Sequence, residues 1–327
     1  MTRSILSTLA ASATLTLATL ASAEVIEVQV RIENLAPENG TFLTPMWIGF
    51  HDGAFDLYDL GEPASMMLER IAEDGNTGPL SQSFLGLGGG DLAGVSEGTI
   101  IADTGIPPIA PGESATMTFR INTELSTSRY FSYASMVLPS NDAFVANGDA
   151  MAHEVVDGNG DFVGAQFMVL GSAVRDAGTE VNDELPMNTA FFGQMAPDTG
   201  VDENGVVDTH PGFNAPGTGG ILDDPTYANG DFTAKGYQVA RVTITEVARV
   251  RVQLENIAPE FGTAVTPLWV GIHDGSFDTY DGGAPSSVEL ERIAEDGDTG
   301  PLTDLFASLE AGADQTTIVA DQGIPVI

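Results

Sequence analysis

Four carboxylates gather within residues 175–185, RDAGTEVNDEL: Asp176, Glu180, Asp183 and Glu184. Hard cations such as Ca²⁺ prefer several oxygen ligands from carboxylates, carbonyls and waters. Asp176 and Glu180 are separated by an Ala-Gly-Thr turn, so both side chains could reach one ion, and Gly178 would allow the backbone to turn tightly. Without a cation, carboxylates this close repel each other and raise each other's pKa.

A second acidic loop, PSNDAF at 139–144, contributes Asp142. It follows the predicted strand 130–138, and RDAGTE follows the predicted strand 164–171. Loops of a β-sandwich gather at its ends, so we expect the two loops to meet and Asp142 to complete a three-carboxylate metal site. The alternative is a pair of solvated acidic loops in an acidic protein, and spacing alone leaves both open.

The chain as a whole is strongly acidic. Its 327 residues carry a net charge of −36 and a single lysine, Lys235. Such a chain should repel nucleic acid and anionic membrane surfaces, so its expected small partners are cations. It has no cysteine, which excludes disulfides, thiolate metal sites and thiol catalysis.

Other motifs predict structure rather than catalysis. DGNGDF at 157–162 begins like a calcium-binding EF-hand loop but has Phe162 and Met168 where that loop needs Gly and Glu, so it predicts a hairpin turn. The pair His51-Asp52 is expected to be structural; the rival is a secreted hydrolase that uses His51 or His210 with a nearby carboxylate. No nucleophile elbow or phosphate-binding loop occurs, and the expectation is that the protein is not an enzyme.

The N-terminus has the features of a secretory signal peptide over residues 1–23. Arg3 supplies the positive charge, residues 5–20 form a short apolar stretch, and Ala21-Ser22-Ala23 is a cleavage signal. We expect export to the periplasm or the exterior, a mature chain from Glu24, and no membrane-spanning helix.

An internal repeat divides the chain. Residues 30–80 match 252–302, LERIAEDG is identical at 68–75 and 290–297, and the match resumes with TIIADTGIP at 99–107 and TIVADQGIP at 317–325. The predicted domains are therefore 24–247 and a partial second copy at 248–327. Either the sequence is a fragment of a longer tandem protein, or the partial copy packs on the first or on another chain. We favour a fragment, because part of a β-domain leaves unpaired strand edges.

Alternating apolar residues predict strands at 26–32, 114–122 and 240–247. One short helix is expected at 65–74, with Ser65 as its N-cap and Gly75 at its end. Many Gly, Pro, Asn and Asp residues lie between these segments. The fold class expected is all-β, an antiparallel β-sandwich with long loops and little helix.

At the acidic loops the chain resembles the spondin N-terminal domain family. The similar segments are YASMVLPSNDAF, DAGTE and the closing YQVARVTITEV, together with HDGAFDLYDLGEPAS nearer the N-terminus. The resemblance implies a C2-like antiparallel β-sandwich that binds calcium through Asp142, Asp176 and Glu180. Asn141 and Ala143 replace the family's Pro and Trp, and Glu180 replaces an Asp. A weaker alternative ligand pair, outside that pattern, is Asp198 with Asp202.

Together these features predict a secreted, non-catalytic, calcium-binding module for extracellular or cell-surface interaction, with an unidentified protein or glycan as partner. Besides the hydrolase, the remaining alternative is a purely structural surface or matrix repeat to which calcium is incidental.

Overall fold

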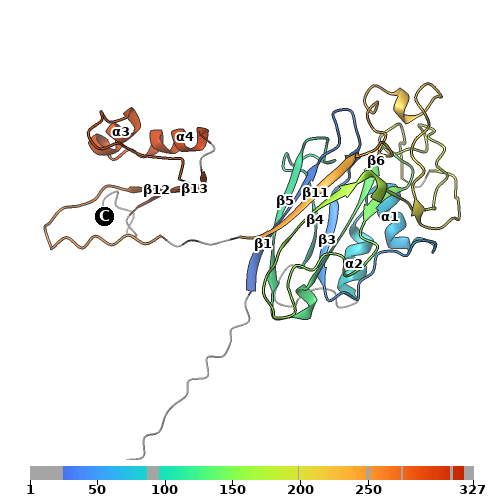
Figure 1. The fold of residues 1–327 in the computed structure, drawn as a ribbon, viewed down its shortest axis with the longest axis horizontal. Coiled ribbons are helices and arrows are strands. Elements are labelled where there is room, and N and C mark those ends of the chain that lie inside the picture. Colours follow the sequence, from blue (N-terminus) through green and yellow to red (C-terminus); the bar gives the residue numbers. More distant parts are fainter. Residues whose placement is uncertain are drawn as a thin grey trace, which may run out of the picture. The chain divides into compact units, whose positions relative to one another are not determined.

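The computed structural model describes residues 25–86, 96–197, 199–247, 250, 252–273, 275–309 and 312–319. The predicted signal peptide, most of the glycine-rich loop at 86–94, Asp198 and Asp274 lie outside these residues. Internal contacts divide the chain into two units, residues 1–248 and 249–327. Figure 1 shows both.

The first unit contains an antiparallel sheet of four strands in the order β5-β1-β11-β8. Val28, Val30 and Ile32 alternate with half-buried or exposed neighbours, as the period-two pattern predicts, and all three are fully buried. The strands are β1 (Val25–Asn34), β5 (Ser114–Asn122), β8 (Ala165–Leu170) and β11 (Gln238–Glu246).

A second antiparallel sheet has the order β10-β9-β7-β6-β3-β4, with β2 paired to β6. Its strands are β2 (Phe42–Leu43), β3 (Met46–His51), β4 (Glu97–Ile100), β6 (Tyr130–Leu138), β7 (Ala143–Ala146), β9 (Arg175–Asp176) and β10 (Asp208–Thr209). Three short 3₁₀ turns connect elements of this unit: η1 (Ser126–Ser128), η2 (Gly171–Ala173) and η3 (Ile221–Asp223).

The main core lies between the two sheets. It includes Ile32 and Val242 from the four-stranded sheet and Ile48, Phe131 and Val145 from the larger one. The predicted antiparallel β-sandwich with little helix is therefore confirmed at the level of fold class.

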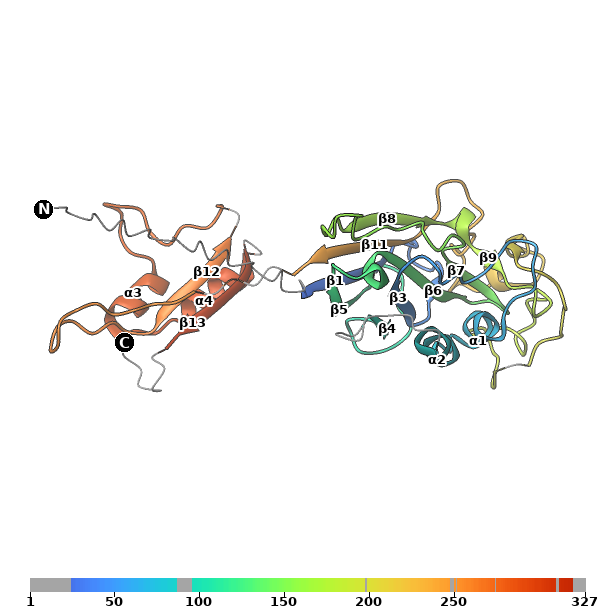
Figure 2. The same cartoon turned by 90° about the horizontal axis from the view of Figure 1, so that it is seen from below.

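Two helices cover the outer face of the larger sheet as a third layer (Figure 2). They are α1 (Met66–Asp74) and α2 (Gly78–Gly86). The Ser65 hydroxyl accepts a hydrogen bond from the Leu68 N–H, and Gly75 ends α1 with φ 65°, so the predicted helix and both its caps are confirmed. The sequence did not predict α2, which buries only Leu80 and Phe84 and so has a weak periodic pattern.

The second unit repeats one edge of the first. It contains β12 (Leu268–His273), β13 (Gly312–Ile318), α3 (Val288–Asp296) and α4 (Gly300–Ser308). The pairing Trp269↔Thr317 has the register of Trp47↔Thr99 in β3–β4. Within the described part of this unit, nothing corresponds to β1, β5, β6, β8 or β11. No described helix of either unit has the length and apolar character needed to cross a membrane.

Candidate metal site in the acidic loops

The short antiparallel pair β7–β9 brings the two acidic loops together. Asp142 directly precedes β7, and its neighbour Ala143 pairs with Asp176 in β9. The two predicted ligands therefore approach each other through strand pairing between segments far apart in the sequence. Their charges interact, since Asp176 contributes to the raised pKa of Asp142.

Asp142 is fully buried, and its two oxygens have different surroundings. Oδ2 accepts hydrogen bonds from the Thr179 N–H at 2.8 Å, the Thr179 hydroxyl at 3.1 Å and the Glu180 N–H at 3.1 Å. Oδ1 is buried without a hydrogen-bond donor among the described residues. Burial, followed by the charge of Asp176, raises the pKa of Asp142 to about 7, although the hydrogen bonds to Oδ2 act in the opposite direction.

Asp176 is oriented by its own loop. Its Oδ1 accepts the Gly178 N–H at 2.8 Å, and its Oδ2 accepts a hydrogen bond from the Asn182 side chain. Gly178 has φ 67°, and a Cβ there would lie 2.6 Å from the Val206 backbone nitrogen. A glycine is thus needed at this turn for both its conformation and its space.

His210, on a loop distant in the sequence, helps to orient Asp176 through Asn182. Sequence reasoning did not predict this role. The His210 Nδ1 accepts the Gly212 N–H at 3.0 Å, and burial lowers the His210 pKa to about 4. The neutral ring therefore carries its proton on Nε2 and donates to Asn182 Oδ1 at 3.1 Å. Asn182, held in this way, presents its amide N–H to Asp176. No spacing signal links His210 to residues 175–185.

Glu180 lies nearby, but its carboxylate has a different environment. The side chain is buried, and its Oε1 accepts the Gly200 N–H at 2.9 Å. The backbone of Glu180 forms a bridge with the exposed Asp202, the described member of the alternative ligand pair. Within the described part of the chain, no three His, Cys, Asp or Glu side chains are arranged as a metal-binding group. The structure brings Asp142 and Asp176 together, and Glu180 stays a predicted third ligand.

Backbone N–H groups and one side-chain amide donate hydrogen bonds to the other two carboxylates of RDAGTEVNDEL. Asp183 accepts hydrogen bonds from the Leu185 N–H at 2.9 Å and the Asn188 side chain at 2.7 Å. Glu184 is buried and accepts from the Ile221 N–H at 2.8 Å and the Asn214 N–H. Glu184 therefore connects this loop to residues 214–221 and has a structural role.

Ca²⁺ fits the Asp142–Asp176 pair on two counts. First, both side chains are carboxylates, which hard cations prefer. Second, Asp142 Oδ1 has no hydrogen-bond donor among the described residues, and burial raises the pKa of the Asp142 carboxyl group. A cation beside this oxygen would favour the ionised form of both side chains.

One of the two histidines of the rival hydrolase hypothesis, His51, is engaged in the core. His51 is buried, its Nδ1 accepts the Gly53 N–H, and burial lowers its pKa to about 4. Its Nε2 therefore carries the proton and donates to the Ser132 hydroxyl at 2.8 Å. A histidine that donates to a buried serine is not positioned to remove that serine's proton.

No protein-family model matches the chain, and a comparison with curated proteins gives no match either. The similarity to the spondin N-terminal domain therefore stays a prediction based on the segments quoted above.

Proposed function

We propose that the first unit is a non-catalytic calcium-binding β-sandwich module of an exported protein, used for extracellular or cell-surface interaction. The ion would be held by Asp142 and Asp176, with Glu180 as the predicted third ligand. The observation that carries the proposal is the buried Asp142 Oδ1, which has no donor among the described residues and lies on a carboxylate beside Asp176.

A bound calcium ion would offset the cost of keeping Asp142 ionised in the core and would fix the loop that contains Asp176 to β7. A ligand that binds only the folded state stabilises it by about 2.7 kcal/mol at a hundredfold excess over Kd. Free calcium outside cells is high enough for sites with a Kd of roughly 10⁻⁴–10⁻³ M.

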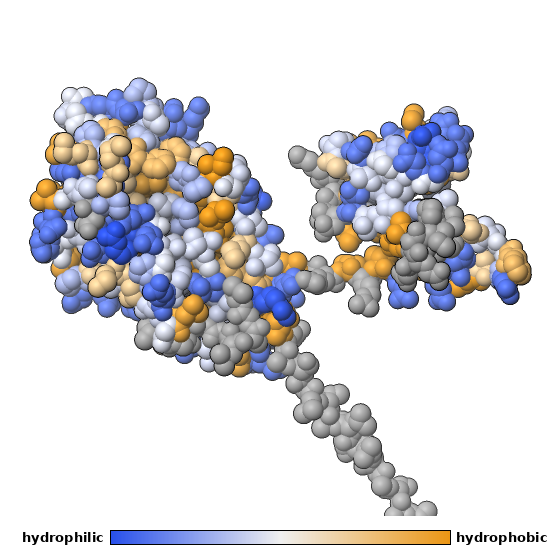
Figure 3. Space-filling view, turned by 180° about the vertical axis from the view of Figure 1, so that it is seen from behind, coloured by the Kyte–Doolittle hydropathy of each residue, from blue (hydrophilic) through white to orange (hydrophobic). Residues whose placement is uncertain are grey.

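A role in interaction is supported by apolar side chains exposed on the long loop after β9. They include Met187, Phe191, Met195 and Val201, of which Met195 is 96% exposed. Figure 3 shows apolar areas among hydrophilic ones on one face of this unit. Exposed apolar groups with a polar surround are typical of protein-interaction surfaces, so they favour a protein over a glycan as the proposed partner.

Thermal unfolding with and without calcium tests the metal site. We expect 5 mM CaCl₂, about ten times the middle of that Kd range, to raise the Tm of the wild-type chain relative to EGTA. Asp176→Ala and Asp142→Asn should each remove this rise, because each deletes one of the paired carboxylates.

Asp59→Asn is the matched control, since Asp59 is exposed and its change removes one negative charge from the same unit. It should keep the full calcium response. An unchanged wild-type Tm, or an equal loss in the Asp59 variant, would contradict a specific site. A calcium response that survives Asp176→Ala would indicate incidental surface binding, as the structural-repeat alternative expects.

A further inference from the structure

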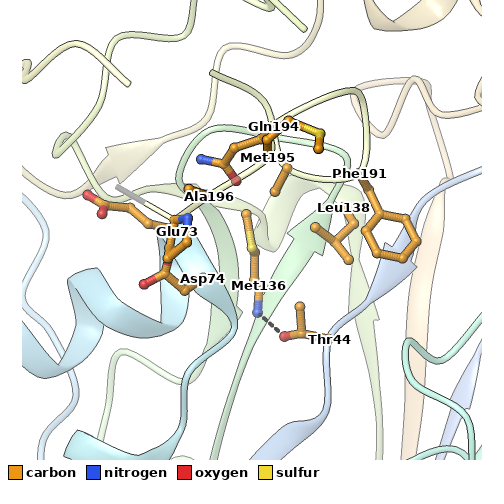
Figure 4. Close-up of a pocket in the computed structure, with 11 residues that line it drawn as sticks. Thr44, Glu73, Asp74, Met136, Leu138, Phe191, Gln194, Met195 and Ala196 are labelled. Atoms are coloured by element: carbon orange, nitrogen blue, oxygen red, sulfur yellow. Dashed lines mark hydrogen bonds between the residues drawn. The ribbon is translucent and has the colours of Figure 1, made fainter. Parts of the chain in front are cut away.

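The two paired carboxylates of the acidic loops are held in place by different means. Asp142 lies between β6 and β7, and the sheet fixes the chain around it. In β6, Met136 donates its N–H to the Thr44 hydroxyl at 3.1 Å (Figure 4). The Ser140 hydroxyl accepts the Ala143 N–H at 3.1 Å across the turn that contains Asp142. The position of Asp142 is therefore set by the core.

Asp176 depends instead on hydrogen bonds to its side chain. It is half-buried and lies in a strand of only two residues. Its Oδ1 accepts the Gly178 N–H from the same turn, and its Oδ2 accepts the Asn182 amide. A side-chain amide can present either its N–H groups or its oxygen. The orientation of Asn182 therefore has to be fixed by another residue.

A short sequence pattern, His-x-Gly, determines where three of the imidazole rings carry their proton. The pattern begins at His51, His210 and His273. In each case Nδ1 accepts the N–H of the glycine two residues later, at 3.0–3.1 Å. A ring nitrogen that accepts a hydrogen bond carries no proton, so the proton of each ring lies on Nε2. The local sequence thus makes each ring an Nε2–H donor, and the fold decides which group accepts.

His210 directs this donor at the acidic loop from a fixed position. It is 4% exposed, and its ring packs edge to face on Phe232 of the main core, with centroids 5.1 Å apart. Its backbone N–H donates to the Val174 carbonyl at 3.2 Å, next to β9. Its Nε2 donates to Asn182 Oδ1 at 3.1 Å. Because the oxygen of Asn182 is occupied in this way, its N–H group faces Asp176.

We propose that His210 is a positioning residue of the calcium site: through Asn182 it fixes the orientation of the Asp176 carboxylate and so raises the affinity for calcium. This inference rests on the proposed calcium-binding function. His210 is not itself a ligand, since Gly212 and Asn182 engage both its ring nitrogens. Hydrogen-bonding partners behind metal ligands typically contribute about 10–100-fold in metal affinity.

Calcium titration at pH 7 of His210→Leu and His51→Leu tests the proposal. His51 is a matched control, because it is equally buried and has the same Nδ1 bond, but its Nε2 donates to Ser132 in the core. We expect His210→Leu to raise the Kd for calcium about tenfold or more, and His51→Leu to leave it unchanged. Both variants should lower the Tm in EGTA, which a merely structural role would do without changing the Kd.

Asn182→Ala provides a second variant outside the core, since its side chain is half-buried on the loop. It should raise the Kd by a factor similar to that of His210→Leu. The double variant should bind calcium as Asn182→Ala does, within about twofold, because His210 acts only through this amide.

The outcomes separate the two proposals. Absence of saturable calcium binding by the wild-type chain would overturn the proposed function and this inference with it. If wild type binds calcium, three results would overturn the inference alone: an unchanged Kd in Asn182→Ala, equal losses in the two histidine variants, or losses that multiply in the double variant.

Discussion

At the scale of single residues, this protein accommodates negative charge mainly with N–H donors. Asp183 and Glu184 each accept two hydrogen bonds, and Asp142 Oδ2 accepts three. Asp142 Oδ1 differs, because it is buried with no donor among the residues described. The proposed calcium ion would therefore act at the one oxygen of this group that has no hydrogen-bond donor among the described residues.

The half-buried His153 predicts a loss of stability in acid. His153 stacks on Phe167 with ring centroids 3.6 Å apart, and burial lowers its pKa from 6.5 to about 4. Between these values the unfolded chain binds a proton that the folded chain does not, so the free energy of unfolding falls as the pH drops from 6.5 towards 4. His153→Phe keeps an aromatic ring and removes this proton uptake.

Urea unfolding at pH 7 and pH 4.5 measures the effect. The stability of wild type relative to His153→Phe should fall on acidification. A pH-independent difference between wild type and the His153 variant would contradict the prediction.

At the scale of elements, both units use one arrangement of a strand pair and two helices. Trp47 lies 5.7 Å from Phe55 and 5.3 Å from Phe84, and Trp269 lies 5.8 Å from Phe277 and 5.2 Å from Phe306. The same aromatic contacts thus join α2 in the first copy, and α4 in the second, to the strand. In the first unit, β6 also pairs with that strand, and the four-stranded sheet covers its other face.

Truncation of Phe84 should destabilise the first unit alone. Phe84 is fully buried, and Phe→Ala changes in cores cost about 3–5 kcal/mol. The chain has two tryptophans, so in a Trp269→Phe background Trp47 fluorescence reports the first unit. Phe84→Ala should lower the urea midpoint of this signal, while Phe306→Ala should leave it in place. An equal shift by both would mean that the units unfold together.

At the scale of the whole molecule, the two copies are expected to differ in metal binding. Residues 248–327 contain no segment that matches PSNDAF or DAGTE, so the second unit has no counterpart of Asp142, Asp176 or Glu180. Equilibrium calcium titration of residues 24–327 should therefore saturate at one ion per molecule at the specific site. Two equivalent ions, or one that survives Asp176→Ala, would contradict this assignment.

The amino-acid sequence by itself determined the elements whose pattern is local. Alternating apolar residues predicted β1 and β5, and the caps Ser65 and Gly75 predicted α1. The internal repeat defined the two copies. Each of these signals depends on neighbouring residues or on direct sequence identity. The helix α2 was missed because its two buried side chains give too short a pattern.

Only the tertiary structure decided which side chains meet. Pairing of β7 with β9 brings Asp142 to Asp176, and the fold positions His210 behind Asn182 and turns Glu180 towards Gly200. These contacts join residues distant in the chain, and they depend on strand register and loop path, which residue spacing does not encode.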